Sequence, residues 1–261
     1  MENFQIVTFN LRYLWDRDGI NSFVHRGALI LEKIREQMPD VICFQEAVDK
    51  NIEFLNSNLA EYNFAHAHRS AKYTGEGVAI AYKRDRFNLF SLDSFWLSDT
   101  PQVAGSRIEG QSSCPRICQC ALLQEKSSGE LFRVVNVHLD YGNAEVEAKE
   151  MAQIIDYLNE KNAILDVPFF VLGDFNSEPD SKAISLCRGS AAPKMVDLTE
   201  NVGCTFHGFG KKMTECKIDY IFTDAKTAEI PHTVEKWEET ANGIYLSDHY
   251  PVCAQLTLSD R

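Results

Sequence analysis

The sequence predicts an α/β fold, namely a four-layered α/β sandwich in which two packed mixed β-sheets are flanked by helices. Three observations predict this class. The order strand, helix, strand occurs twice, and each time the chain returns to a strand that ends in polar residues. A hydrophobic content of 44% is enough for a sizeable core in 261 residues. No linker or low-complexity tract divides the chain, so we expect a single domain over residues 1–261.

The first half of the chain contains one strand, helix, strand unit followed by further strands. Apolar runs predict the strands, and apolar residues at intervals of three and four predict the helices. In order, we expect a strand over residues 4–10, a helix over 25–38, a strand over 41–46, a helix over 47–59, and strands over 64–69, 77–84 and 87–98. Residues 99–116 contain two prolines and two glycines, so they predict a long loop.

A β-hairpin opens the second half, where residues 118–124 and 131–140 flank the turn sequence KSSGE. Along its second arm, Asn136, His138 and Asp140 alternate with apolar residues, which places the three polar side chains on one face. The remaining expected elements are an amphipathic helix over residues 145–161, an apolar strand over 167–176, and a strand within KIDYIF at 217–222.

Short polar motifs recur along almost the whole chain, and we expect each of five to lie where a strand ends. They are TFNLRY (8–13), FQE (44–46), NVHLD (136–140), GDFN (173–176) and SDHYP (247–251), and KIDYIF repeats the pattern with Asp219 beside an apolar aromatic run. Buried strands carry few charges, so charged and amide side chains at their mouths indicate a function. Together the motifs predict an active site for phosphate ester chemistry.

The order of these motifs resembles that of the endonuclease/exonuclease/phosphatase superfamily, from residue 4 to about residue 258. The resemblance implies the fold described above and a metal-dependent phosphoric ester hydrolase. It also implies that Asp174 orients or deprotonates the attacking water and that Asn176 holds the scissile phosphate. His249 would lie against the phosphate, with Asp219 accepting its other ring proton and favouring the imidazolium.

His138 is the second histidine that we expect to face the phosphate, as a candidate proton donor to the leaving group. A lone histidine in a strand is more often a core or surface residue, but the Asn-x-His-x-Asp face and the resemblance favour a site. Asp174 and Asn176 also have an alternative, because Asp-Phe-Asn can form a turn in which side chains bond their own backbone.

A bound divalent cation helps phosphate ester hydrolysis, because it offsets the charge of the phosphate and stabilises the leaving oxygen. Mg²⁺ prefers oxygen ligands, so we expect Mg²⁺ as the cofactor, with Mn²⁺ as a substitute. Glu46 is the first-choice ligand, and Asn10 and Asp248 complete the set. The alternative for Glu46 is a surface carboxylate that caps the following helix. Arg12 stands where some DNA-repair members carry an acidic residue, so the number of metal ions stays open.

Loops around the shared centre are expected to select the substrate. Arg116 ends the long loop, where a guanidinium can bind a phosphate through two hydrogen bonds, although a surface arginine is the alternative. Asp140 is expected to contact the substrate from the polar strand face. Aromatic rings stack on the apolar faces of sugars and equally on bases. The other residues expected to bind substrate are Trp96, His207 and Phe209.

The net charge bears on the substrate. There are 26 basic and 38 acidic residues, which gives a net charge of −12. A nuclease has to neutralise several phosphates of a polyanion, so this total disfavours nucleic acid without excluding it. The segments FWLS, CPRI and TFHGF resemble those of bacterial sugar-phosphate phosphatases. We therefore expect a phosphatase that acts on a small phosphorylated carbohydrate. The alternatives are an endo- or exonuclease of DNA or RNA, a phospholipid or inositol phosphate hydrolase, and a catalytically inert binding module.

The remaining expectations concern the surroundings of the protein. No stretch of 18 apolar residues occurs and no secretory signal precedes the first strand, so we expect a cytoplasmic protein with no membrane partner. The eight cysteines, several of them in strand-like runs, are expected to be reduced thiols. The sequence leaves the oligomeric state open.

Overall fold

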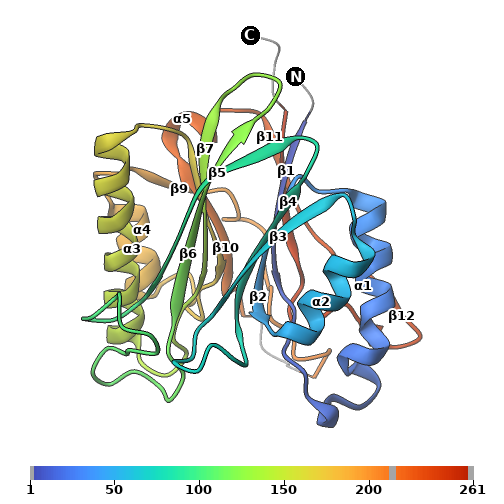
Figure 1. The fold of residues 1–261 in the computed structure, drawn as a ribbon. Helices are drawn as coiled ribbons and strands as arrows, with labels where there is room; N and C mark the ends of the chain where they lie inside the picture. Colours follow the sequence, from blue (N-terminus) through green and yellow to red (C-terminus); the bar gives the residue numbers. More distant parts are fainter. Residues whose placement is uncertain (1–2, 212–215, 258–261) are drawn as a thin grey trace.

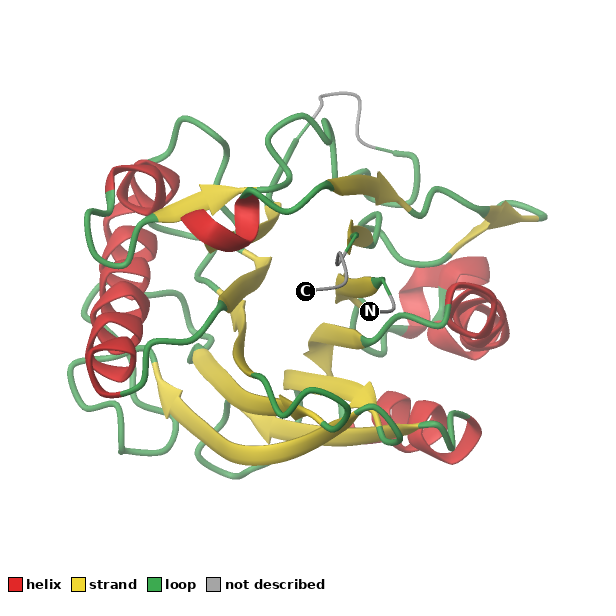
Figure 2. Cartoon of the chain, turned by 90° about the horizontal axis from the view of Figure 1, so that it is seen from above, coloured by secondary structure: helices red, strands yellow, loops and turns green. Residues whose placement is uncertain are grey.

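The computed structural model describes residues 3–211 and 216–257, which form two β-sheets packed face to face with helices outside (Figure 1). Seen from above, the sheets lie in the middle and the longer helices lie on the two outer sides (Figure 2). The predicted four-layered α/β sandwich is confirmed.

The first sheet contains six strands, and α1 and α2 pack on its outer face. Its central pair, β1 and β2, runs parallel, and every other neighbouring pair in this sheet is antiparallel. In spatial order the strands are β11 (His232–Lys236), β14 (Val252–Leu256), β1 (Phe4–Asn10), β2 (Val41–Ala47), β4 (Gly77–Lys83) and β3 (Tyr62–His68). The helices on this side are η1 (Asp16–Asn21, a 3₁₀ helix), α1 (Phe23–Gln37) and α2 (Asp49–Asn58).

The second sheet also contains six strands, and α3 and α4 pack on its outer face. Strands β7 and β8 run parallel and are joined through α3, as a strand, helix, strand unit requires. In spatial order the strands are β5 (Phe87–Trp96), β6 (Ile117–Glu125), β7 (Leu131–His138), β8 (Phe169–Asp174), β10 (Asp219–Asp224) and β9 (Met195–Asp197). The helices are α3 (Ala144–Ile164), α4 (Lys182–Gly189) and the short α5 (Ala225–Ala228), and β12 (Thr240–Ala241) pairs with β13 (Ile244–Tyr245) separately.

Alternation along the central strands divides the core into three layers. On β1, Val7 and Phe9 pack outward against the helices, whereas Ile6 packs inward between the sheets. On β7, Val135 and Val137 pack outward and Val134 inward. Both faces of these strands are therefore buried, which explains their nearly continuous apolar runs.

A polar contact also joins the two sheets near one end. Gln45 Nε2 donates to Asn136 Oδ1 at 2.8 Å, and Asn136 Nδ2 donates to the carbonyl oxygens of Phe44 and Ala79 at 3.0 and 2.9 Å. The pairing of β2 with β4 shifts register between Phe44 and Ala47, which is a β-bulge. Asn136 thus bonds the backbone where the regular pairing is interrupted, and Glu46 lies within that bulge.

The polar motifs meet at one end of the strands of both sheets, at the bottom of Figure 1 and away from the two termini. Asn10, His138 and Asp174 end their strands, as predicted. SDHYP follows the end of the short β13 and precedes β14, so Asp248 and His249 stand before the strand of the large sheet and not after it. β14 runs antiparallel to β1, so its beginning lies beside the end of β1. Asp219, at the start of β10, reaches the same edge in the same way beside Asp174.

Candidate active site

Three side chains converge on one carboxylate oxygen, Asp174 Oδ2. Asn10 Nδ2 donates to it at 2.9 Å, while His138 Nε2 and His249 Nε2 lie 3.5 and 3.7 Å away. The last two distances are too long for strong hydrogen bonds. All four side chains are nearly buried. Both imidazoles thus face the same carboxylate, but neither Nε2 makes a full hydrogen bond with it. Long contacts of this kind are expected in a site that tightens around a substrate.

Strand pairing explains how residues from distant parts of the chain meet there. In the parallel pair β7 and β8, His138 is opposite Asp174, and in the antiparallel pair β8 and β10, Asp174 is opposite Asp219. Gly173 makes the first pairing feasible, since a Cβ at that position would lie 1.9 Å from the Val137 carbonyl oxygen. Its φ of +153° also lies in a region that side chains disfavour.

For Asp174 and Asn176, the sequence left open an active-site pair and a turn. The structure is compatible with both at once. Asp174 Oδ1 accepts from the backbone N–H of Asn176 at 2.9 Å, which is the Asx turn, while Oδ2 points to the histidines. Asn176 has a positive φ of 49°, and its Nδ2 donates to the Leu139 carbonyl oxygen. The turn therefore fixes the Asp174 carboxylate and places the backbone N–H of Asn176 beside it. A phosphate contact by Asn176 stays a prediction.

His249 is held from behind by Asp219, whose Oδ2 lies 2.9 Å from His249 Nδ1. Burial alone would lower the pKa of His249, but the negative charges of Asp219 and Asp174 outweigh it and raise that pKa to about 10. Asp219 is fixed in turn through its backbone N–H, which donates to Thr205 Oγ1 at 3.1 Å. The structure thus provides the buried imidazolium that the resemblance implies.

The two other titratable groups at the centre shift in opposite senses. Burial raises the pKa of Asp174 to about 6, despite the positive charge of His249. Burial lowers the pKa of His138 well below its ordinary value, and the charges of Arg116 and Arg69 lower it further. His138 is therefore neutral in the free protein, so a role as proton donor requires a bound anion that offsets those two cations.

Glu46, Asn10 and Asp248 form an oxygen-rich group next to this centre. Glu46 Oε2 accepts from the Tyr13 N–H at 2.8 Å, and Asn10 Nδ2 approaches Glu46 Oε1 at 3.3 Å. These contacts do not match the capping alternative, because Glu46 accepts from Tyr13, and the N–H of Val48 at the start of α2 donates to the Asn51 side chain. Glu46 has a strained φ of 51°, as residues at functional sites often do.

The charges of this group fit a bound cation. Burial raises the pKa of Glu46, and the neighbouring negative charge of Asp248 raises it further. Two carboxylates that repel each other at a partly buried site are stabilised by a cation between them. Arg12 supplies part of that charge, since its Nη1 lies 3.6 Å from Asp248 Oδ2. Glu46 and Asp248 therefore suit one hard divalent ion. Asn10 turns its Nδ2 toward Glu46 and its Oδ1 toward the Arg12 N–H, so a metal contact by Asn10 stays a prediction.

Asp174, Asp219 and His249 also have ligand atoms within 4.8 Å of one another, as a metal site would. We assign this cluster to the charged histidine instead. An imidazolium has no lone pair for a metal, and its Nδ1 already bonds Asp219.

Arg116 is buried beside His138, and its environment is unusual. Its Nε and Nη1 have no hydrogen-bond partner, and Nε lies 3.7 Å from Asp140 Oδ1. A buried guanidinium with two unpaired nitrogen atoms is costly unless a ligand completes it. Asp140 is fully buried and accepts from the N–H and Oγ of Ser112, in the long loop. Asp140 thus holds the loop that carries Arg116. This role does not match the direct substrate contact that was expected for Asp140.

The aromatic residues expected at the substrate are placed differently from one another. Trp96 is only 8% exposed and its Nε1 donates to the Arg69 carbonyl oxygen, so stacking of a sugar on it does not fit the structure. His207 is buried, with its ring stacked on Tyr250 at 4.0 Å. Phe209 is half-buried and lies over the Arg26 guanidinium at 5.8 Å. A substrate contact by Phe209 stays a prediction.

Two charged residues near the site were not predicted. Arg69 acts on the charge of His138, and its Nη2 pairs with Glu76 at 2.9 Å. Glu76 is in turn influenced by the charges of Glu46 and Arg116. Arg69 ends a predicted strand, so the rule that placed the five motifs would also have placed Arg69.

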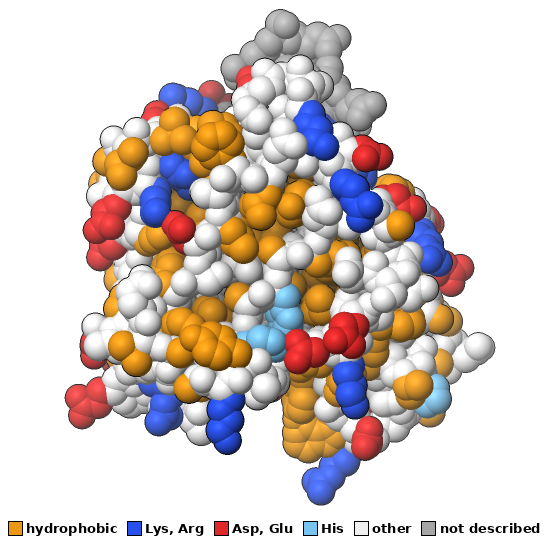
Figure 3. All heavy atoms as spheres, in the orientation of Figure 1, with side chains coloured by type: hydrophobic (Ala, Val, Ile, Leu, Met, Phe, Trp, Pro, Cys, Tyr) orange, Lys and Arg blue, Asp and Glu red, His pale blue; other side chains and the backbone are white. Residues whose placement is uncertain are grey.

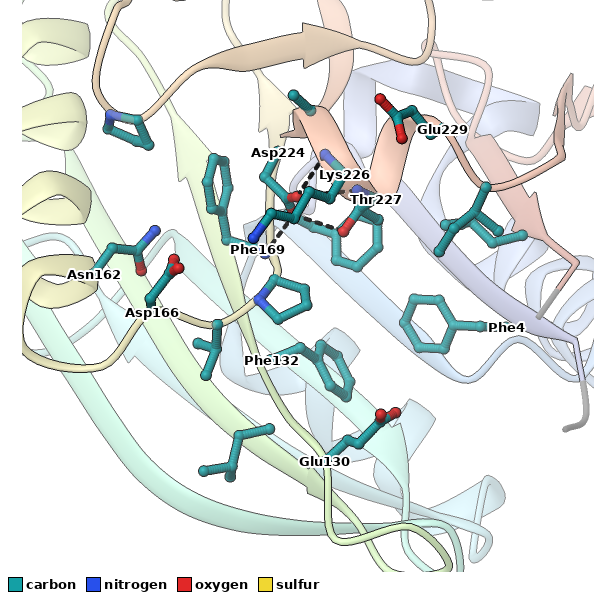
Figure 4. Close-up of a pocket in the computed structure, with 18 of the residues that line it drawn as sticks. Phe4, Glu130, Phe132, Asn162, Asp166, Phe169, Asp224, Lys226, Thr227 and Glu229 are labelled. Atoms are coloured by element: carbon teal, nitrogen blue, oxygen red, sulfur yellow. Dashed lines mark hydrogen bonds between the residues drawn. The ribbon is translucent and has the colours of Figure 1, made fainter. Parts of the chain in front are cut away.

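A cavity of about 1020 Å³ lies away from this centre, at the opposite ends of the strands and near Phe4, Phe132 and Phe169 (Figure 4). Phe4 opens β1 and Phe169 opens β8, whereas Asn10 and Asp174 close them. This cavity is therefore separate from the candidate active site.

Two further expectations concern the cysteines and the possibility of a membrane-spanning helix. The cysteines of the described residues form no disulfide bond. Within residues 3–211 and 216–257, none of the helices combines the length and the apolar character needed to cross a bilayer.

Comparison with known proteins places this architecture in a family. The profile of the endonuclease/exonuclease/phosphatase family matches residues 7–249, and the chain belongs to that family. Members of the family are phosphoesterases or nucleases.

Individual relatives differ in what they are named for. An endonuclease/exonuclease/phosphatase from Bacteroides vulgatus superposes with a TM-score of 0.89 at 28% identity, covering 99% of this chain and 100% of that one. A mannosyl-6-phosphatase from Bacteroides thetaiotaomicron gives 0.84 at 22% identity, covering 98% and 100%, which shows a common fold. Nocturnin of Drosophila melanogaster is 31% identical over 178 residues, or 59% of this chain. The chain spans about a quarter of Nocturnin, since the match covers 24% of it.

Proposed function

We propose that the protein is a Mg²⁺-dependent phosphoesterase that removes the phosphate from a small phosphorylated carbohydrate. The observation that carries the proposal is the convergence of Asn10, His138 and His249 on Asp174 Oδ2, next to the carboxylates of the metal group. Such a site offers a base, a fixed positive charge and a metal position within one buried centre, as phosphate ester hydrolysis needs.

The residues of the chain would share the reaction as follows. The water oxygen forms a bond to phosphorus while its proton passes to Asp174, and the bond between phosphorus and the sugar oxygen breaks. His249, held charged by Asp219, donates a hydrogen bond to a phosphate oxygen. His138 is the candidate donor of the proton that the leaving oxygen takes up, once the bound phosphate raises its pKa.

The metal group supports Mg²⁺ in preference to zinc, because the charged donors of Glu46 and Asp248 are carboxylate oxygen atoms. When bound to Glu46, Asn10 and Asp248, the cation would supply charge neutralisation and stabilise the leaving oxygen. Mn²⁺ accepts the same donors and is the expected substitute.

Arg116 supports a terminal phosphate as the group that is bound. A phosphate monoester carries a dianion that can complete the two unpaired guanidinium nitrogen atoms. The net charge of −12 favours a small substrate over a polyanion. The mannosyl-6-phosphatase agrees with this substrate class but contributes only a likeness of fold.

A nuclease is the second candidate function. Nocturnin is the relative that the sequence itself matches at 31% identity, and the other curated relatives include exoribonuclease subunits of the CCR4-Not complex. Arg12 and Arg69 add positive charge near the centre, where a phosphodiester would lie. Phospholipid or inositol phosphate hydrolysis, which share the same chemistry, rank below both.

A cytoplasmic location is also proposed. It is supported by the lack of disulfide bonds among the described cysteines, since a reducing compartment keeps thiols reduced.

Phosphate release from a panel of sugar phosphates, together with p-nitrophenyl phosphate and its bis-ester, tests the function. We expect the monoester and one or a few sugar phosphates to be cleaved with Mg²⁺, and plasmid DNA to stay intact. The Asp174→Asn variant serves as the control for contaminating phosphatases. Cleavage of the bis-ester and nicking of plasmid, with every monoester untouched, would replace the phosphatase by the nuclease.

A further inference from the structure

A second cluster of metal-ligand side chains lies outside the active site, on the edge strand β3 and at the first residue of α2. His66 and His68 are two residues apart on β3, so both side chains project from the same face. Asp49 Oδ1 lies 3.0 Å from His68 Nε2 and 3.6 Å from His66 Nδ1. On the face of the molecule that carries β3, histidine and acidic side chains adjoin (Figure 3).

In each ring, one nitrogen faces Asp49 and the other faces away from it. The nitrogen that faces away, here called the outer nitrogen, is fixed by a backbone carbonyl. His66 Nε2 lies 3.2 Å from the Ala47 oxygen, and His68 Nδ1 lies 3.2 Å from the Gly75 oxygen. A carbonyl only accepts, so each outer nitrogen carries the proton. When a cation is bound, both rings would be neutral, and His66 Nδ1 and His68 Nε2 would present their lone pairs on the side of Asp49. Metal-ligating histidines show this arrangement, with the second nitrogen donating to a carbonyl.

We propose that Asp49, His66 and His68 bind a first-row transition cation, of which Zn²⁺ is the best fit. Bonds of about 2.0–2.1 Å in a tetrahedron separate neighbouring ligand atoms by about 3.3 Å. The two separations from Asp49, 3.0 and 3.6 Å, lie on either side of that value, and all three ligand atoms lie within 4.8 Å of one another. Three protein ligands leave the fourth position to water.

Ligand chemistry separates this site from the active centre. Two imidazoles favour zinc, cobalt or nickel over Mg²⁺, whereas the active-centre group has oxygen donors. The Asp49 side chain is 54% exposed, so a cation can enter from solvent.

The bound cation would fasten β3 to the start of α2. Asp49 follows Glu46 by three residues, and the carbonyl partner of His66 belongs to Ala47, next to Glu46. The site would therefore stabilise the connection that carries the proposed Mg²⁺ ligand. A ligand that binds only the folded state raises the melting temperature, and its absence should lower the melting temperature without removing the active centre.

The test is metal binding to the full chain after chelator treatment and dialysis. The Glu46→Gln/Asp248→Asn variant weakens the active centre, so that uptake reports the second site. We expect this variant to bind one equivalent of Co²⁺ with the intense visible absorption of tetrahedral coordination, and Zn²⁺ to displace it. Adding His66→Gln and His68→Gln should abolish the signal, whereas adding His232→Gln, at an exposed histidine outside the cluster, should leave it unchanged.

Thermal unfolding supplies a second measurement that does not need the active-centre substitutions. Zn²⁺ should raise the melting temperature of the otherwise wild-type protein and of His232→Gln, but much less that of His66→Gln/His68→Gln. An absent Co²⁺ spectrum, or uptake that survives the loss of both histidines, would overturn the site and show that the cluster is only a hydrogen-bonded ion pair.

Discussion

The two histidines of the candidate active site differ in charge, and the residues behind them explain the difference. His249 faces Asp219 and Asp174, whose negative charges outweigh burial and raise its pKa. Burial lowers the pKa of His138, and Arg116 adds to the effect. In the free protein, one imidazole is thus a cation and the other a neutral group. This asymmetry suits a centre in which one histidine stabilises charge and the other exchanges a proton.

The first prediction concerns the pH dependence of activity. The proposed base Asp174 has a raised pKa of about 6 and must be ionised, so kcat/KM should rise with pH through about 6. His249 has a raised pKa of about 10 and must be protonated, so kcat/KM should fall as pH rises through about 10. Asp219→Asn removes the largest cause that raises the His249 pKa, and the alkaline limb should move to lower pH. If the alkaline limb of Asp219→Asn stays in place, deprotonation of His249 does not cause that limb.

A second prediction is that Asp219 and His249 act as a unit. Asp219→Asn and His249→Ala should each lower kcat by roughly 10² to 10⁴, the range for a positioned acid or base. The double variant should lose little more than either single variant, because both remove the same imidazolium. Kinetics of the three variants, each with an unchanged melting temperature, test this. Losses that multiply would show that the two residues act separately.

The third prediction concerns the metal group. Activity should vanish in EDTA and return with Mg²⁺ or Mn²⁺, and Glu46→Gln should lower kcat by roughly 10² or more, as the loss of an electrostatic contact does. The control is Glu53→Gln, at an exposed position of α2. Full activity of Glu46→Gln in EDTA would contradict the metal assignment.

Much of the centre was predictable because its residues end buried strands, where polar side chains are conspicuous. Asn10, His138 and Asp174 show this directly. The unpaired nitrogen atoms of Arg116 and the burial of Trp96 were not predictable, since they depend on how the long loop folds over the sheet. No local pattern fixes such a loop.

At the scale of elements, two local departures from regular strands shape the site. The bulge in β2 lets Glu46 leave the strand pairing, and Asn136 bonds the backbone around that bulge from the other sheet. Gly173 lets β8 approach β7 closely just before Asp174. Both departures coincide with residues for which we propose catalytic or metal-binding roles, where local strain is expected to gather.

The fourth prediction tests the role of Gly173. Gly173→Ala should lower the free energy of unfolding by roughly 3 kcal/mol, at the upper end for overpacking, because its Cβ would meet the Val137 carbonyl oxygen. Gly189→Ala is the matched control, since nothing lies within 4 Å of a Cβ there and its effect should stay within about 0.5 kcal/mol. Urea denaturation measures both variants. Equal stability of the two variants would show that the close approach is not required.

The predicted elements were those with long periodic patterns, and their boundaries moved by a few residues. The helix expected over residues 47–59 is α2, which begins at Asp49. The elements not predicted are short or lie at sheet edges, such as β9 and β11, where few residues alternate and tertiary pairing decides the conformation. The direction of β14 was also not predictable, because a motif beside a strand does not indicate which end it occupies.

At the scale of the whole molecule, the acidic total of −12 surrounds a centre with several cationic side chains. Arg12, Arg69 and Arg116 lie near the centre, so the local charge there differs from the total. A small dianion needs only this local charge. A polynucleotide also needs charge along its length, which an acidic surface opposes.

The salt dependence of turnover on two substrates tests the central claim most directly. Rates on a sugar phosphate and on single-stranded DNA or RNA would be measured from about 50 to 200 mM salt with Mg²⁺. We predict phosphate release from the sugar phosphate with a shallow salt dependence, because one dianion is bound at a buried centre. Polynucleotide cleavage should be slow at every salt concentration. Fast cleavage of the polynucleotide that falls by about 10³ or more over this range, with the sugar phosphate unchanged, would contradict the phosphatase and establish the nuclease.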